Sequence, residues 1–146
     1  MRRAAAGARV EAMLEHLRAT PDVSSALAAR LRRGERVDGF GHPLYGNGDP
    51  RAAMLLERLR ERYRRSTELT FIGRVVAAAA RVTREKPNLD FSLAALARVL
   101  GLPDGAPLML FAIGRTIGWI GHALEQYSTD QLIRPRARYV GVVPPS

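Results

Sequence analysis

The sequence from Gly39 to Ala52 reads GFGHPLYGNGDPRA, and it combines a histidine, a turn and the start of a helix. His42 follows a glycine and precedes a proline, so little side-chain bulk shields its imidazole. Asp49 has the features of a helix N-cap, and Pro50 suits the first helical position because an amide there has no partner to lose. The stretch therefore predicts a turn that presents His42 and a helix that begins at Pro50.

Arg51 falls in the first turn of this helix, at the positive end of the helix dipole, where a cation is normally disfavoured. Free backbone amides, a guanidinium and a nearby imidazole can together bind a carboxylate or a phosphate. These residue types predict an anion site near Arg51 and His42. A structural role for His42 stays open, in which the ring bonds a carbonyl group of its own turn.

Hydrophobic residues recur at helical spacing over most of the chain. Asp22 and Ser24 can cap a helix that ends at Gly34. With such caps and glycines at helix ends, the pattern predicts an all-α protein with helices near residues 8–20, 22–34, 50–65, 67–84, 91–101 and 107–126. In the third helix the pattern turns Met54, Leu55 and Leu59 inward. The last helix is apolar on all sides, which predicts that it is buried. Residues 37–44 are too rich in glycine for a helix, and we expect a turn or a short strand there.

Composition excludes several classes of protein. The chain has 146 residues and is 47% hydrophobic, enough to build a core. No apolar run approaches the ~18 residues that span a bilayer, and the N-terminus is too polar for a secretory signal, so we expect a cytoplasmic protein without a membrane partner. The chain has no cysteine, which excludes disulfides and thiolate metal sites, and its three histidines lack metal-ligand spacing. No metal is expected.

The formal charge of +9 raises the question of nucleic-acid binding. Arginines are scattered through every segment, and aromatic residues make up only 6% of the chain. Nucleic-acid binding normally needs a basic stripe with groove-reading or stacking residues. The pattern therefore favours solvated, ion-paired faces, and we expect no nucleic-acid partner. A binding site for anionic substrates would also account for the excess of positively charged residues.

Three further segments accompany the first. They are NLD at 88–90, GRTIGWIGHALEQ at 114–126 and RPRARYVG at 134–141. In this order, and with GFGH and DPR before them, they resemble the motifs of the citrate synthase family. The resemblance covers most of the chain and the C-terminal part of a family member. It implies a truncated, all-α citrate synthase-like fold, in which 1–90 form a small-domain-like segment and 91–146 the closing helices and tail of the large domain.

The resemblance also implies a function, the condensation of acetyl-CoA or another acyl-CoA with oxaloacetate or a similar 2-oxo acid, giving citrate and CoA in the tricarboxylic acid cycle. In such an acyltransferase His42 contacts the ketone oxygen and Asp90 is the catalytic base. No cofactor is tightly bound, because the acyl-CoA is a co-substrate. By the same resemblance, the carboxylate-binding arginines are Arg51, Arg115 and Arg134, and the glycines at the acyl-CoA are Gly39 and Gly41.

Each of these residues also has a structural alternative. Asp90 has the features of an N-cap for the helix that opens at Phe91. Arg115 lies in the most apolar helix, where an unpaired charge is costly, so it needs a partner. That partner is either a substrate or an acidic residue, Glu125 or Asp130. Arg134 lies in a tail where arginines are often solvated, and Arg136 or Arg138 can share its role. His122, two turns beyond Arg115, has no expected catalytic role.

The resemblance breaks at the start of the chain. The family's second catalytic histidine is expected where this chain reads MRRAAAG, and Gly46 stands where many relatives carry a cation near the cofactor phosphates. We therefore expect the isolated chain to be inactive, and to act as a homodimer or with an N-terminal partner chain. The alternative is a non-catalytic module that binds a carboxylate or CoA, or that pairs with an intact homologue.

Overall fold

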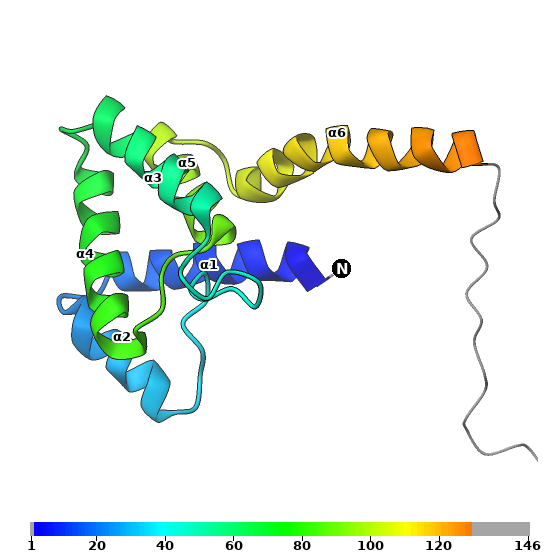
Figure 1. Ribbon diagram of the computed structural model, residues 1–146. Coiled ribbons are helices and arrows are strands. Elements are labelled where there is room, and N and C mark those ends of the chain that lie inside the picture. The colour runs from blue at the N-terminus through cyan, green and yellow to red at the C-terminus, as the bar shows by residue number, and fades with distance from the viewer. Residues whose placement is uncertain (1, 130–146) are drawn as a thin grey trace, which may run out of the picture. The chain divides into compact units, whose positions relative to one another are not determined.

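The computed structural model describes residues 2–129, and within this range the chain folds into six helices (Figure 1). They are α1 (Arg2–Arg18), α2 (Val23–Arg32), α3 (Pro50–Arg62), α4 (Thr67–Thr83), α5 (Leu89–Leu100) and α6 (Ala106–Thr129). The all-α class is confirmed. The chain divides into two compact units, of which the first ends at Ile113 and the second begins at Gly114. Within 2–129, no helix is both long and hydrophobic enough to cross a bilayer.

Helix α5 is the central element of the first unit. It packs against α1, α3 and α4, and α2 packs against α4. Ser92, Ala94 and Ala95 of α5 are fully buried, and such small side chains let the neighbouring helices approach closely. The first turn of α5, which carries Asp90, is therefore fixed by packing on several sides.

Side-chain caps start the helices where the sequence predicted them for α2 and α3. The Asp22 carboxylate accepts hydrogen bonds at the start of α2, and the Asp49 carboxylate does so at the start of α3. In α5 the cap is Asn88, whose Oδ1 accepts hydrogen bonds from the amides of Asp90 and Phe91. The interpretation of Asp90 as an N-cap is therefore wrong, because Asp90 already lies within the helix.

Two other local predictions were wrong. Met54 of α3 is 59% exposed, whereas Leu59 is buried as predicted, together with Ala52 and Leu56. Helix α1 begins at Arg2, earlier than expected, because the alanine-rich start of the chain favours helix.

The segment between α2 and α3 crosses the start of α5. Phe40 forms an isolated β-bridge with Pro87, and its ring lies 4.8 Å from the ring of Phe91. Gly39 and Gly41 have positive φ angles of 85° and 73°. A Cβ at Gly39 would lie 2.9 Å from the Cβ of Phe91, so only glycine permits this approach. The turn or short strand predicted at 37–44 is confirmed as turns around a single bridge residue, Phe40, and it brings His42 to the N-terminus of α5.

Helix α6 runs from the first unit into the second, and it differs from the prediction in one respect. Its large apolar side chains are exposed, among them Ile117 at 79% and Leu124 at 63%. The sequence predicted a buried helix. The apolar composition shows that this helix is suited to burial.

Candidate active site

Backbone hydrogen bonds tie the loop at 39–42 to the segment before α5. The amide of Gly41 donates to the carbonyl of Lys86 at 3.0 Å, and the amide of Asn88 donates to the carbonyl of Gly39 at 2.9 Å. These two hydrogen bonds fix the position of the loop, and so of His42, beside the N-terminus of α5.

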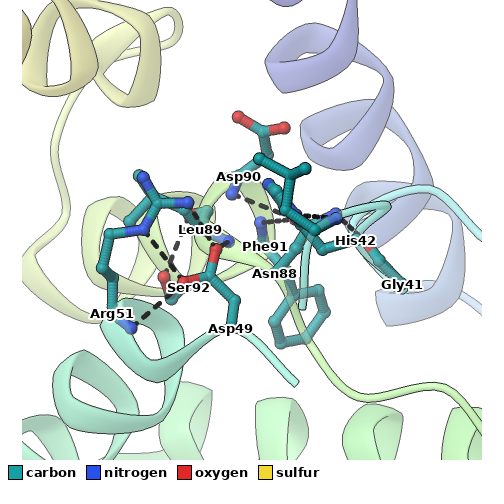
Figure 2. A network of polar contacts seen from close by, with 10 residues as sticks. Gly41, His42, Asp49, Arg51, Asn88, Leu89, Asp90, Phe91 and Ser92 are labelled. Atoms are coloured by element: carbon teal, nitrogen blue, oxygen red, sulfur yellow. Dashed lines mark hydrogen bonds and ion pairs between the residues drawn. The ribbon is translucent and has the colours of Figure 1, made fainter. Parts of the chain in front are cut away.

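The side chain of Asn88 connects the loop to the helix (Figure 2). Its Nδ2 donates to the carbonyl of Gly41 at 3.0 Å, while its Oδ1 accepts from the amide of Asp90 at 3.0 Å. One side chain therefore positions both the residue before His42 and the backbone of Asp90. Asp90 was selected from the NLD motif in the sequence. The structure shows that Asn88 of the same motif positions the backbone of Asp90.

The imidazole of His42 makes one hydrogen bond within its own turn. Its Nδ1 accepts from the amide of Leu44 at 3.1 Å. Since Nδ1 is the acceptor, the neutral ring carries its proton on Nε2. No hydrogen bond within residues 2–129 uses that Nε2, so the ring has a donor to offer. The structural alternative for His42 was a hydrogen bond to a carbonyl group of its own turn. The structure shows instead a hydrogen bond from the amide of Leu44 to the ring.

Asp49 and Arg51 form a two-point ion pair. The side chain of Asp49 is fully buried, and that of Arg51 is 44% exposed. Arg51 Nε donates to Oδ1 of Asp49 at 2.9 Å, and Nη2 donates to Oδ2 at 2.8 Å. Among the described residues, no hydrogen bond engages Nη1 of Arg51. Figure 2 shows the guanidinium lying along the carboxylate.

Asp49 also connects two helices. Its Oδ1 accepts from the amide of Arg51 in α3 at 3.1 Å, and its Oδ2 accepts from the amide of Leu89 in α5 at 3.2 Å. The hydrogen bond from the Arg51 side chain is the largest cause that holds the pKa of Asp49 below its usual value. The same contact raises the pKa of Arg51, to which the more distant charge of Asp90 also contributes.

This shift predicts a dependence of stability on acid pH. A carboxyl group with a lowered pKa in the folded state stabilises the fold fully above its unfolded value, here 3.8, and loses this contribution as the pH falls through the folded value. We expect the difference in unfolding free energy between the wild type and Asp49→Asn to be constant above about pH 5 and to shrink below about pH 4. Urea titrations of both proteins across this range measure it. A difference that does not change with pH would contradict the assignment.

Tyr45 links His42 to Arg51. The ring centroids of Tyr45 and His42 lie 4.7 Å apart, and the guanidinium carbon of Arg51 lies 5.5 Å from the centroid of Tyr45. A guanidinium at this distance is attracted to the ring, most strongly where it lies over the face. Tyr45 was not selected from the sequence, because its ring contacts depend on how the turn at 43–48 folds back.

A cavity of about 380 Å³ lies beside this network. His42, Asn88 and Asp90 contribute to its wall, together with loop residues 36–44 and Arg9 of α1. Asp90 is half-buried, and no ion pair within the described part of the chain involves its carboxylate. Arg51 does not line the cavity. The structure therefore brings His42 and Asp90 to one cavity and leaves Arg51 outside its lining, in contact with the Tyr45 ring that also contacts His42.

The remaining predicted arginines lie elsewhere. Arg115 belongs to the second unit, and its side chain is exposed rather than buried. The expected alternative partner, Glu125, lies 3.3 Å from Nδ1 of His122 instead. The prediction that Arg115 is buried is wrong, because the apolar residues beside it on α6, Ile113 and Ile117, are themselves exposed. Arg134 lies outside the described residues, as do Asp130, Arg136 and Arg138.

The fold and the site define an all-helical protein in which an imidazole and a carboxylate share one cavity, with a guanidinium close by. The family model for the citrate synthase C-terminal domain matches residues 2–136. The chain belongs to the citrate synthase family.

Similar proteins agree with this assignment. Citrate synthase 2 of Bacillus subtilis is 38% identical over 136 residues, which are 88% of this chain and 36% of that protein. Citrate synthase of Haloferax volcanii is 41% identical over 114 residues, 76% of this chain and 30% of that protein. The crystal structure of citrate synthase from Thermotoga maritima matches 97% of this chain and 40% of its own, with a TM-score of 0.78 and 30% identity. The chain spans about a third of the length of these curated relatives.

Proposed function

We propose that this chain contributes Asp90 and His42 to an active site that condenses an acyl-CoA with a 2-oxo acid. With acetyl-CoA and oxaloacetate the products are citrate and CoA, a reaction of the tricarboxylic acid cycle. The observation that carries the proposal is the single cavity lined by both residues, in a member of the citrate synthase family. The acyl-CoA is a co-substrate, and no tightly bound cofactor is proposed.

Asp90 is the proposed base. Its carboxylate accepts a proton from the methyl carbon next to the thioester carbonyl, and the electron pair of that C–H bond forms an enolate. The enolate carbon then attacks the ketone carbon of the 2-oxo acid, so that the new carbon–carbon bond forms while the ketone π bond breaks. Its electron pair moves to the ketone oxygen, which takes up a proton and becomes the hydroxyl of the adduct. Water hydrolyses the thioester of the adduct, releasing the CoA thiol and leaving a carboxylate on the product. A base within reach of the proton is the first requirement for this step.

His42 is the proposed donor to the ketone oxygen. As the carbon–carbon bond forms, negative charge develops on that oxygen, and a fixed N–H aimed at it lowers the barrier. The bond from Leu44 to Nδ1 supports this role, because it leaves the proton on Nε2 and restrains the ring.

The arginines are proposed to bind the carboxylates of the 2-oxo acid. Arg51 already uses Nε and Nη2 for Asp49, which leaves Nη1 for a substrate. Arg115 and Arg134 are proposed as the other two carboxylate ligands, and Gly39 and Gly41 as backbone contacts of the acyl-CoA. Both glycines have positive φ angles, which favour glycine. Without side chains at these two positions, the loop backbone can approach a ligand closely.

The proposal extends to the assembly. We propose that the chain works as a homodimer or with a chain that supplies the N-terminal part of a family member, in the cytoplasm, with residues 1–90 and 91–146 as its two domain portions. The family's relatives are about three times as long as the segment matched here. A closed site that excludes water and orients two substrates therefore needs more protein than these residues.

The 146 residues alone are expected to show no turnover with acetyl-CoA and oxaloacetate. A chimaera that joins the N-terminal part of B. subtilis citrate synthase 2 to this chain is expected to release CoA thiol, measured with a thiol reagent. The parent B. subtilis enzyme is the positive control. Ordinary enzymatic turnover by the 146 residues alone would contradict the first expectation. A folded chimaera that binds both substrates without turnover would instead favour the non-catalytic module.

A further inference from the structure

Asp90 lines a second, smaller cavity besides the one that it shares with His42. This small cavity has a volume of about 10 Å³, against about 380 Å³ for the larger one. Its lining comes from α1, α5 and the start of α6, all within the first unit, and consists of Gly7, Asp90, Leu93, Pro107, Leu108 and Phe111. The residue proposed as the base therefore lies at the boundary of two cavities of very different size.

The lining of the small cavity is apolar apart from Asp90. Among the described residues that form it, Asp90 is the only one with a polar side chain. Leu93 and Pro107 are buried, and Leu93 lies about one turn after Asp90 on the same face of α5. A buried water molecule needs several polar partners, which this lining does not provide. The small cavity is therefore suited to an apolar group, and its volume of about 10 Å³ is just enough for one group the size of a water molecule or a methyl.

The proposed reaction gives the small cavity a role. A base acts on a carbon within reach of its carboxylate, so the carbon that loses its proton lies beside Asp90. The 2-oxo acid has to reach both this carbon and Nε2 of His42, and it therefore occupies the larger cavity, which both residues line. A substituent on the reacting carbon is left with the other side, where Leu93 lines the small cavity.

We propose that the small cavity receives the substituent on the reacting carbon of the acyl-CoA, and that Leu93 limits this substituent to a single methyl group. The inference rests on the proposed function and specifies its acyl group. Acetyl-CoA has no substituent on that carbon and propionyl-CoA has one methyl, so both fit, whereas the ethyl group of butyryl-CoA does not. Leu93 is thus a specificity residue with no part in the proton transfer.

The chimaera with the N-terminal part of B. subtilis citrate synthase 2 tests this limit with acetyl-, propionyl- and butyryl-CoA, each paired with oxaloacetate. Thiol release gives kcat/KM for each acyl-CoA. Propionyl-CoA is expected to be used, and butyryl-CoA to be at least tenfold poorer, because one methylene in an apolar pocket changes kcat/KM by roughly ten- to two-hundredfold. A ratio of two substrates measured on one protein does not depend on the folded fraction, so it stays informative for a destabilised variant.

Two substitutions of Leu93 change the cavity in opposite directions. Leu93→Ala leaves room for a longer chain, so the ratio of butyryl-CoA to propionyl-CoA use is expected to rise about tenfold or more. Leu93→Phe fills the cavity, so the ratio of propionyl-CoA to acetyl-CoA use should fall by a similar factor. The matched control is Leu96→Ala, the same change at a half-buried leucine of α5 that lines neither cavity. Its ratios should equal those of the unsubstituted chimaera.

The outcomes separate this inference from the proposed function. If the chimaera uses acetyl-CoA but both Leu93 variants keep its substrate ratios within about twofold, the assignment of Leu93 fails and the proposed function stands. Equal use of propionyl-CoA and butyryl-CoA by the unsubstituted chimaera has the same meaning, as does a failure to use propionyl-CoA. A folded chimaera that uses none of the three acyl-CoAs would overturn both.

Discussion

Asp90→Asn is expected to lower kcat of the B. subtilis chimaera by roughly a hundred- to ten-thousandfold, the range that a positioned general base contributes. Asparagine has nearly the same shape as aspartate but cannot accept the proton from the acyl methyl group. The backbone of Asp90 is fixed by Asn88 and by the packing of α5, so the substitution should change chemistry rather than position. The thiol-release assay at saturating acetyl-CoA and oxaloacetate measures the loss.

A matched control separates this effect from a general loss of negative charge. Asp104 is exposed and lines a different cavity of the first unit, so Asp104→Asn should leave kcat unchanged. The KM values for both substrates should change little in Asp90→Asn, because the carboxylate acts on the transition state. If kcat fell less than about tenfold, another group would have to be the base and the role of Asp90 would be withdrawn.

The local features of this fold were predictable from the sequence because they depend on neighbouring residues. Asp22 and Asp49 were expected as caps from their place before a helical stretch, and both are caps. The short extended segment with His42 was expected from its glycines. Such features need only backbone geometry and hydrogen bonds that span two or three residues.

The connections within the site were not predictable in this way. Asp49 and Leu89 are 40 positions apart, and Asn88 and Gly41 are 47 apart, so no local rule relates them. Their hydrogen bonds exist because the first unit packs α3 against α5. The motif resemblance identified Asp49 and Asn88 as neighbours of site residues, whereas their role in joining the two helices needed the coordinates.

For helix α6 the prediction of burial was wrong. Its apolar residues predicted burial, and on that basis Arg115 was expected to be buried with a partner. Hydrophobicity shows that a surface favours removal from water but does not show which chain covers it. The exposed Ile117 and Leu124 are therefore suited to removal from water, but their hydrophobicity does not identify what would cover them.

Asp49→Ala is expected to lower the free energy of unfolding of the first unit by about 2 to 4 kcal/mol. Loss of an N-cap accounts for about 1 kcal/mol of this. The amide of Leu89 loses its acceptor in a partly buried position, and an unsatisfied buried donor typically costs about 1 to 3 kcal/mol. The ion pair adds less, because the Arg51 side chain is partly exposed and can be solvated once Asp49 is gone.

Asp22→Ala provides the matched comparison for Asp49→Ala. Asp22 is also an N-cap, but it is exposed and its hydrogen bonds stay within the first turn of α2. The loss in Asp49→Ala should therefore exceed that in Asp22→Ala, and the excess measures the bond between α3 and α5 together with the smaller contribution of the ion pair with Arg51. Urea unfolding followed by far-ultraviolet circular dichroism at neutral pH gives both values. Equal losses would show that Asp49 acts only as a cap, and that the contact with Leu89 contributes nothing to joining the helices on which His42 and Asp90 depend.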